Sequence, residues 1–152
     1  MVSITKSVWV ILQYDDEVLL LKRSKKSNNH KLWNFPGGGI EKNETAKKSA
    51  VREVKEEAGI DIKVQDLIFT ERQVTNKRVM YFYTVFLERK PDVKLNKESS
   101  DFKWLKWEDF PAKLHKPTKR FVQVRERKSE VSSTGGNLFD LVRNLVDSIN
   151  RK

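Results

Sequence analysis

The sequence contains no cysteine. This absence excludes disulfide bonds, thiolate metal sites and a cysteine nucleophile, and it is compatible with a reducing cytoplasm. Long hydrophobic runs are also missing. The apolar run near the N-terminus covers only residues 8–12, which is too short for a signal sequence or a membrane span. We therefore expect a cytoplasmic protein that does not bind membranes and that relies on oxygen and imidazole chemistry.

Internal repeats, low-complexity tracts and linkers long enough to divide the chain are likewise absent from the sequence. A chain of 152 residues fits one domain, which buries roughly 70% of the surface that it exposes when unfolded. With 38% hydrophobic and 10% aromatic residues, the composition is that of an ordinary globular protein. We predict a single domain over residues 1–152 with a packed core.

Acidic residues are fewer than basic ones: 21 Asp and Glu stand against 31 Lys and Arg, which gives a formal charge of +10. Such an excess favours polyanionic ligands through long-range attraction. Many of the basic side chains gather in two blocks, over residues 22–31 and 113–128. The blocks are typical of a solvated surface, and a phosphate-facing role is the alternative.

Apolar periodicity predicts most of the regular elements. Two runs rich in leucine and β-branched residues, 8–14 and 18–22, are separated by a polar turn and predict a β-hairpin. Residues 78–88 carry apolar side chains on both faces, which is typical of a central strand. The remaining predictions are strands over residues 62–71 and 102–107, a helix from Thr118, and a C-terminal amphipathic helix over residues 138–149 with Asn137 as its N-cap.

A shaped loop and a helix lie between these strands. Residues 33–39 read Trp-Asn-Phe-Pro-Gly-Gly-Gly, and proline and glycine both interrupt regular structure. Residues 45–58 then predict a helix, because alanine and valine recur at every fourth position and Gly59 marks its end.

Three glutamates on this helix carry the candidate chemistry. Glu53, Glu56 and Glu57 stand three and four residues apart, so at about 3.6 residues per turn they share one side of the helix. Like charges at this spacing destabilise a helix by a few tenths of a kcal/mol per pair, and a hard divalent cation would reverse that effect. Mg²⁺ is the natural candidate. The alternative explanation is a charged surface helix, since glutamate also favours helix formation.

The spacing of a longer string decides between these explanations. It runs Gly38, five residues, Glu44, seven residues, Arg52-Glu53-Val54, one residue, Glu56-Glu57, one residue, Gly59-Ile60. At average residue frequencies a match at nine such positions has a chance on the order of 10⁻¹⁰ to 10⁻⁹ per starting point. The string resembles the box of the Nudix hydrolase family (MutT-like) at every defining position. The resemblance extends with less specificity to residues 33–37 and to Glu98, Asp101 and Trp104.

The resemblance implies a fold and an activity. The fold is α/β, a Nudix-type α/β/α sandwich with a mixed β-sheet, and the activity is hydrolysis of a phosphoanhydride by water that attacks phosphorus. The implied cofactor is Mg²⁺, with Mn²⁺ as an alternative ion. Glu53, Glu56, Glu57 and the backbone carbonyl of Gly37 are the implied metal ligands.

The resemblance also implies roles for the surrounding polar residues. Glu44 is similar to a family carboxylate that lies next to the metal ligands, and Arg52 to the residue that orients a box glutamate through a charge-assisted hydrogen bond. Glu53 is our choice as general base. Glu98 is the rival, as the base, as an additional metal ligand or as a loop charge, and Asp101 is a weaker candidate.

Three functions remain open from the sequence. The first is a nucleotide pyrophosphohydrolase that acts on a small nucleoside diphosphate derivative, such as a triphosphate, a dinucleotide or a nucleotide sugar. The second is removal of phosphates from an RNA 5′ end, for which the basic blocks would neutralise backbone phosphates. The third is a nucleotide-binding module that has lost hydrolysis. The base, the number of metal ions and the oligomeric state are not determined by any string in the sequence.

The other aromatic residues and the histidines are expected to be structural. Trp33, Phe35, Trp104 and Trp107 fit the core or a pocket wall better than a base-stacking platform, because large aromatic side chains usually pack inside. His30 and His115 lie in basic, polar stretches without metal-ligand spacing, and neither is assigned a catalytic role.

Overall fold

The computed structural model describes residues 3–27, 29–135, 146 and 149–151. The chain divides into two compact units, Met1–Pro117 and Thr118–Lys152. One domain over residues 1–152 therefore stays a prediction. The proposed cap Asn137 and most of the predicted C-terminal helix lie outside the described residues. Of that helix, Val146 and Ile149 are described, and both are exposed.

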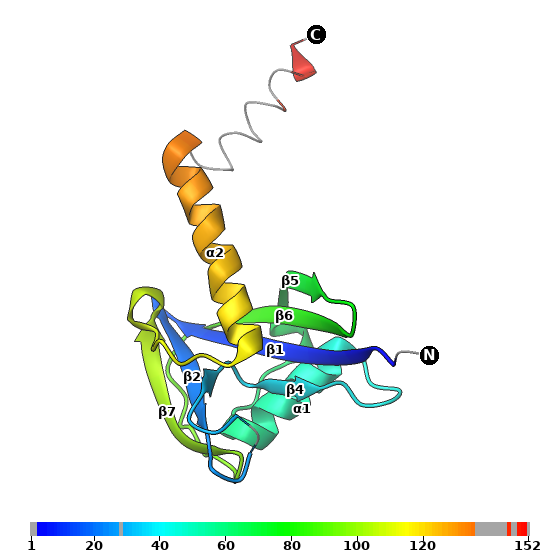
Figure 1. The fold of residues 1–152 in the computed structure, drawn as a ribbon, viewed down its shortest axis with the longest axis vertical. Coiled ribbons are helices and arrows are strands. Elements are labelled where there is room, and N and C mark those ends of the chain that lie inside the picture. The colour runs from blue at the N-terminus through cyan, green and yellow to red at the C-terminus, as the bar shows by residue number, and fades with distance from the viewer. Residues whose placement is uncertain (1–2, 28, 136–145, 147–148, 152) are drawn as a thin grey trace. The chain divides into compact units, whose positions relative to one another are not determined.

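The first unit is built on a seven-stranded mixed sheet (Figure 1). Strands β1 and β6 pair in parallel, and the other pairs of strands are antiparallel. The main path runs β3-β2-β1-β6-β5, while β4 pairs with β1 and β7 pairs with β2. This confirms the predicted α/β class and mixed sheet. The strands are β1 (Thr5–Tyr14), β2 (Glu17–Arg23), β3 (Trp33–Asn34), β4 (Gly37–Gly39), β5 (Ile68–Val74), β6 (Arg78–Leu87) and β7 (Ser99–Lys106).

Two α-helices and two short 3₁₀ turns complete the described structure. The helix predicted over residues 45–58 is confirmed as α1 (Ala46–Ala58), and the later helix is α2 (Lys116–Gly135), which begins two residues before the predicted start. The 3₁₀ turns are η1 (Val64–Asp66) and η2 (Trp107–Asp109). Within the described part of the chain, no helix is both long enough and apolar enough to cross a membrane.

The five predicted strands are confirmed, although β1 and β7 each begin three residues before the predicted start and one strand begins later than predicted. The first two strands form the expected hairpin, with Tyr14 opposite Glu17, and β6 is central because it lies between β1 and β5. The strand predicted over residues 62–71 begins only at Ile68. Ile62 and Leu67 are both buried, and in a strand a separation of five residues would place them on opposite faces. The 3₁₀ turn between them lets both side chains reach the same core.

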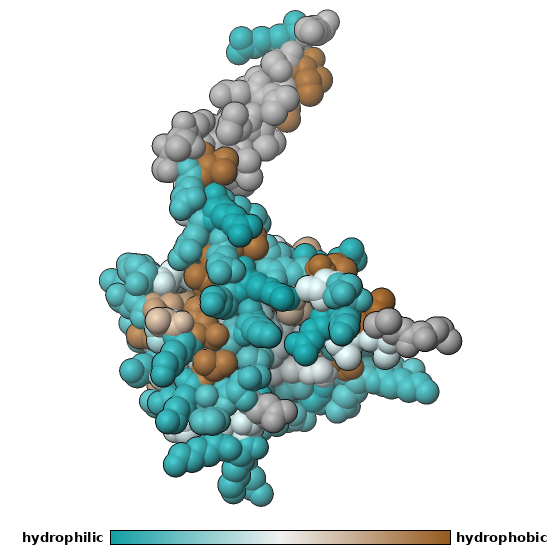
Figure 2. Space-filling model, viewed as in Figure 1, coloured by the Kyte–Doolittle hydropathy of each residue, from teal (hydrophilic) through white to brown (hydrophobic). Residues whose placement is uncertain are grey.

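The core of the first unit lies between α1 and the sheet. Alternate residues of β1, Val8, Val10 and Leu12, are buried in one cluster with the apolar residues of α1 that recur at every fourth position. Burying each large side chain contributes about 1.5–3 kcal/mol, so this layer fixes how α1 sits on the sheet. On the face that Figure 2 shows, hydrophilic side chains predominate over the described residues.

The expectation that Trp33 and Phe35 are core residues is confirmed, because 7% of Trp33 and none of Phe35 is exposed. The ring of Phe35 makes edge contacts with Trp107 and Phe110, at 6.1 and 6.3 Å between ring centres. Trp104 is partly buried and packs against the main cluster. These aromatic side chains therefore contribute to the packing of the first unit.

Candidate active site

Helix α1 presents two of its glutamates to the interior. Thr45 caps its N-terminus by accepting a hydrogen bond from the Lys48 backbone N–H at 3.1 Å, and Gly59 ends it with a φ of 68°. Because the apolar residues of α1 face the sheet, the neighbouring positions Glu53 and Glu57 are carried partly under it. Their exposed fractions are 8% and 6%. Buried carboxylates of this kind need compensation by hydrogen bonds or cations.

The glycines of β4 lie directly over these carboxylates. The backbone N–H of Gly37 donates to Oε2 of Glu57 at 2.8 Å. A Cβ atom added to Gly38 would stand 2.6 Å from Oε1 of Glu53, and one added to Gly37 would stand 2.1 Å from the carbonyl oxygen of Val8. Both contacts are far below van der Waals distance. Only glycine therefore lets β4 lie this close to both the helix carboxylates and β1.

Arg52 holds a network of acidic groups on the outer side of the site. Its guanidinium donates to both oxygens of Glu44, at 2.8 and 3.0 Å, to Oε1 of Glu53 at 3.1 Å and to Oε2 of Glu56 at 3.2 Å. It also donates to the Gly39 carbonyl at 3.1 Å. These contacts lower the pKa of Glu44 to about 2 and raise that of Arg52 further above its usual value. Arg52 thereby joins α1 to the glycine strand.

The carboxylates on the inner side have the opposite electrostatics. Burial raises the pKa of Glu57 to about 9, and the nearby charges of Glu53 and Glu98 add to the rise. The pKa of Glu53 is also raised, mainly by burial, although Arg52 opposes the shift. Among the described residues, no Lys, Arg or His forms an ion pair with Glu57. Of the two inner carboxylates, Glu53 thus shares Arg52 with Glu44 and Glu56, and Glu57 has no cationic partner in the described part of the chain.

This donor set fits a hard divalent cation. The groups are carboxylate and carbonyl oxygens, which Mg²⁺ and Mn²⁺ accept, and a bound cation would offset both the burial and the repulsion between carboxylates that raise the pKa of Glu57. Within the described chain, however, no three His, Cys, Asp or Glu side chains are already gathered as a metal site. The side chain of Glu56 is 53% exposed and is held by Arg52. Its predicted ligand role therefore requires it to leave that ion pair.

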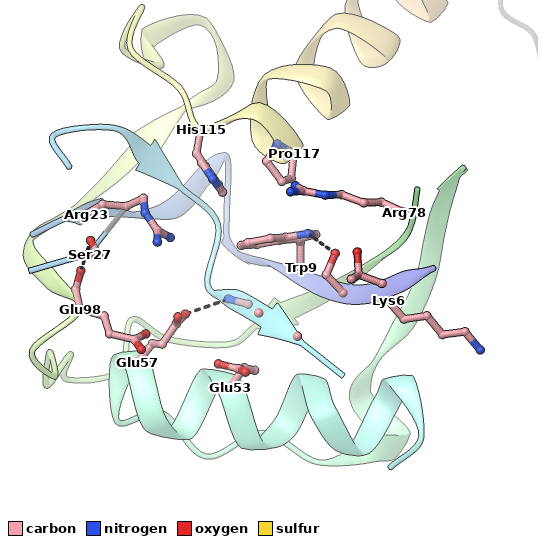
Figure 3. A pocket seen from close by; sticks show the side chains of 15 residues that line it. Lys6, Trp9, Arg23, Ser27, Glu53, Glu57, Arg78, Glu98, His115 and Pro117 are labelled. Atoms are coloured by element: carbon pink, nitrogen blue, oxygen red, sulfur yellow. Dashed lines mark hydrogen bonds between the residues drawn. The ribbon is translucent and has the colours of Figure 1, made fainter. Parts of the chain in front are cut away.

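A cavity of about 530 Å³ opens between α1, β4 and β1, and Gly37, Glu53, Glu57 and Glu98 line it together (Figure 3). Glu98 reaches it through backbone pairing, because its carbonyl accepts the Ser24 N–H at 2.8 Å next to the paired strands β2 and β7. Of the other predicted residues, Arg52 lies beside the cavity through its contact with Glu53, while Glu56 and Asp101 do not line it. Asp101 is exposed and accepts the Phe102 N–H.

The opposite wall was missed by the sequence analysis. Figure 3 shows Arg23, Arg78, His115 and the ring of Trp9 on the other side of β4 from the glutamates. Arg78 is brought there by the parallel pairing of β6 with β1, and His115 by its backbone N–H, which donates to the Trp33 carbonyl at 2.8 Å. The basic block over residues 22–31 was a signal for Arg23. The sequence offers no comparable signal for the others.

Trp9 and His115 contact each other within this wall. Their ring centres are 5.7 Å apart at an interplanar angle of 65°, and the Trp9 indole N–H donates to Ser7 Oγ at 3.1 Å. Burial lowers the pKa of His115 to about 4, and the positive charges of Arg23, Arg78 and Lys116 add to the effect. His115 is therefore a neutral ring at neutral pH. The cavity combines an acidic wall with a wall of cations and aromatic rings.

The chain is also similar in sequence to known proteins. The family profile of the NUDIX domain matches residues 4–124. The chain is 30% identical over 76 residues to the CTP pyrophosphohydrolase of Escherichia coli (strain K12), a match that covers 50% of this chain and 56% of that protein. It is 35% identical over 132 residues to diphosphoinositol polyphosphate phosphohydrolase 2 of Mus musculus, which covers 82% and 70% of the two proteins.

Solved structures agree at the level of the fold. The crystal structure of the MutT protein from Methanosarcina mazei Go1 is similar with a TM-score of 0.66 at 26% sequence identity. That similarity covers 84% of this chain and 96% of the other. The MutT protein thus shares the fold of this chain, while the names of the two relatives found by sequence point to chemically different substrates.

Proposed function

Because the chain belongs to the NUDIX domain family, we propose that it hydrolyses a phosphoanhydride bond of a nucleoside diphosphate derivative, with Mg²⁺ as the cofactor and Mn²⁺ as an alternative ion. Triphosphates, dinucleotides and nucleotide sugars all contain such a bond. One observation carries the proposal: Glu53 and Glu57 are buried beside a cavity, and among the described residues only Glu53 has a cationic partner, Arg52. Carboxylates in that setting favour a bound cation.

Glu53, Glu56, Glu57 and the Gly37 carbonyl are the groups that we propose to hold the ion. The ion supplies positive charge that neutralises phosphate oxygens and makes a water molecule easier to deprotonate. The Gly37 N–H already holds one oxygen of Glu57 beside the cavity that both residues line. The raised pKa of Glu57 supports this role, since the cation replaces the missing counter-charge.

Glu53 is the proposed general base. It takes a proton from the attacking water, the water oxygen bonds to phosphorus, and the bond to the bridging oxygen breaks so that the leaving phosphate takes its electron pair. Arg52 holds Oε1 of Glu53 at 3.1 Å and so orients the carboxylate. The raised pKa of Glu53 makes it a stronger base than an exposed glutamate. Glu98, in the same cavity, is the alternative base.

The cationic wall serves the same reaction. A phosphate chain carries dense negative charge that repels a nucleophile, and guanidinium groups can neutralise it without taking part in bond making. Arg23 and Arg78 line the cavity opposite the glutamates. We assign them to the phosphates that are not held by the ion.

The test is a screen of nucleotides for release of phosphate or pyrophosphate with Mg²⁺ present. We expect turnover of at least one nucleotide, its loss in excess chelator, and its loss in Glu53→Gln. Glu108→Gln is the matched control, because Glu108 is exposed and does not line the cavity. Tight nucleotide binding without any release would instead identify a binding module that has lost hydrolysis.

Removal of phosphates from an RNA 5′ end is the second candidate function, and the charge of +10 favours it. Binding to an RNA backbone weakens steeply as salt rises, with a slope of about −0.7 in log–log form for each phosphate neutralised on a single strand. Turnover of 5′-triphosphorylated RNA and of free nucleotides should therefore be compared at several salt concentrations. A marked preference for RNA at low salt that vanishes at high salt would favour this second function.

A further inference from the structure

The cavity wall formed by His115 and Trp9 suggests which class of substrate is selected. The relatives act on chemically different molecules by name: one is a CTP pyrophosphohydrolase and another a diphosphoinositol polyphosphate phosphohydrolase. Both names describe substrates rich in phosphate, but only CTP carries an aromatic base. The wall opposite the glutamates is therefore the place where the two classes would be distinguished.

Gly37 lies between this wall and the acidic side of the cavity. Gly37 donates its N–H to Glu57, and a Cβ atom on Gly37 would stand 2.7 Å from Cε3 of the Trp9 ring. The indole and the carboxylate thus lie on the two sides of one glycine. A substrate whose phosphates are held beside Glu57 has its next chemical group within reach of this wall.

Trp9 is a fixed support rather than an open surface. Only 6% of it is exposed, and its position is set by the hydrogen bond to Ser7 and by the close approach of Gly37. His115 packs its ring against this support and is less buried than Trp9. His115 is therefore the ring that a ligand in the cavity would meet, and Trp9 holds it in place.

The charge of His115 argues against a phosphate as its partner. Burial and the nearby cations Arg23, Arg78 and Lys116 keep its pKa near 4, so the ring is neutral at neutral pH. A neutral, planar imidazole is a favourable surface for another flat ring, because aromatic rings stack or pack edge to face. A phosphorylated polyol has no flat ring and would gain nothing from the imidazole itself.

Folding alone does not explain the placement of His115. Its Nδ1 atom is buried and has no hydrogen-bond partner within the described chain. Leaving such a group unpaired costs about 1–3 kcal/mol, and an unpaired buried group in a native protein calls for an explanation, of which a functional role is one.

We propose that His115, supported by Trp9, contacts the aromatic base of the substrate, so that the enzyme selects nucleotides over phosphorylated polyols and bare phosphate chains. This inference rests on the proposed hydrolytic function and deepens it. His115 then determines specificity, while the glutamates on the other side of β4 carry out the hydrolysis. The phosphates lie toward Gly37 and Gly38, and the base lies toward His115.

The experiment compares a nucleoside triphosphate with inorganic tripolyphosphate, which has the phosphate chain but no base. In His115→Ala we expect KM for the nucleoside triphosphate to rise about 10-fold or more while kcat changes little, because stacking on one base contributes about 1–3 kcal/mol. Turnover of tripolyphosphate should be unchanged. His115→Phe should restore most of the nucleotide affinity, because it keeps the ring. His30→Ala is the matched control, since His30 is exposed and lies outside the cavity.

Two results with His115→Ala would overturn the inference: an equal loss of activity toward both substrates, or no loss of activity toward either. Equal turnover of the two substrates by the natural protein would also overturn it, and would leave the proposed hydrolysis intact.

A titration with a nucleoside monophosphate in chelator, measured by calorimetry, separates the proposed base contact from the proposed hydrolysis. If the natural protein binds the monophosphate, His115→Ala loses it and no nucleotide is hydrolysed, the base contact stands and the hydrolytic function fails. If His115→Ala does not fold, His115→Phe against His115→Leu gives the same comparison.

Discussion

Two carboxylates at the two ends of the same site, Glu44 and Glu57, have opposite electrostatic environments. Glu44 receives two hydrogen bonds from Arg52, and its pKa falls to about 2. Glu57 receives one backbone hydrogen bond and faces other carboxylates, and its pKa rises to about 9. Within the described residues, Glu44 has a counter-charge and Glu57 has none. The difference separates a group that supports the structure from a group that requires a cation.

The largest expected effect comes from removing the carboxylate of Glu57. In Glu57→Gln we expect kcat to fall at least about 100-fold, because the metal supplies several kcal/mol of charge stabilisation in the transition state. The melting temperature in chelator should not fall, since glutamine removes a buried acid and keeps a similar shape. Steady-state kinetics and thermal unfolding of the same preparation measure both. A loss of folding that matches the loss of activity would remove the basis for the assigned role.

The next largest effect comes from removing Arg52, the counter-charge of Glu44. Arg52→Gln should lower activity about 10- to 100-fold, the usual cost of losing a residue that orients metal ligands. Arg52→Lys should not restore it, because one ammonium group cannot replace a guanidinium that contacts Glu44, Glu53 and the Gly39 carbonyl together. Lys55→Gln, on the same helix but paired with exposed Asp61, is the control and should retain activity. Full activity in Arg52→Lys would contradict the orienting role.

The comparison also predicts opposite dependences of stability on pH in the absence of metal. A carboxyl whose pKa is lowered by folding stabilises the fold above its unfolded value of 4.5, so the contribution of Glu44 is lost as pH falls toward about 2. A carboxyl whose pKa is raised stabilises the fold fully only below 4.5, so the contribution of Glu57 is lost as pH rises through about 9.

Chemical denaturation in chelator across this pH range checks the second dependence. The free energy of unfolding of Glu57→Gln minus that of the natural protein should increase between about pH 5 and about pH 9, because glutamine does not titrate. Added Mg²⁺ should reduce that difference by stabilising only the natural protein. A difference that stays constant with pH would mean that Glu57 ionises normally.

The smallest expected effect comes from destabilising α1, the helix that carries Arg52 and Glu57. Thr45→Ala removes the side-chain cap of α1 and should destabilise the protein by about 1 kcal/mol. The carboxylates stay in place because apolar packing against β1 holds the helix, so kcat should be nearly unchanged. Denaturant titration and kinetics test the two parts. A large loss of kcat would show that the cap, and not the packing, positions the site.

One wall of the site could be predicted from the sequence because it is local. Glu44, Arg52, Glu53 and Glu57 lie within fourteen positions, and helical periodicity places the last two on one side of α1. Periodicity did not reveal that the Glu56 carboxylate binds Arg52 and does not line the cavity, because the direction of that side chain depends on local geometry. The start of β5 was missed for a similar reason, since the core contacts of Ile62 and Leu67 decide it.

The other wall is not local, and only Arg23, in the basic block over residues 22–31, has a signal along the chain. Trp9, Arg23, Arg78 and His115 come from four segments, and they meet because Thr5 pairs with Arg78, Trp9 with Gly37, and the Trp33 carbonyl with the His115 N–H. A strand can be predicted from its composition, but its partner and register depend on the whole fold. His115, which was assigned no catalytic role from the sequence, lines the cavity and is the clearest case.

The most direct test of the account is metal binding itself. Free Mn²⁺ can be counted by electron paramagnetic resonance during titration of the natural protein, Glu57→Gln and Glu108→Gln. We predict that the natural protein and Glu108→Gln bind Mn²⁺ alike, while Glu57→Gln binds it at least about tenfold more weakly, because a carboxylate ligand is lost. Equal Mn²⁺ affinity in all three proteins would contradict the claim that the inner carboxylates form a divalent cation site.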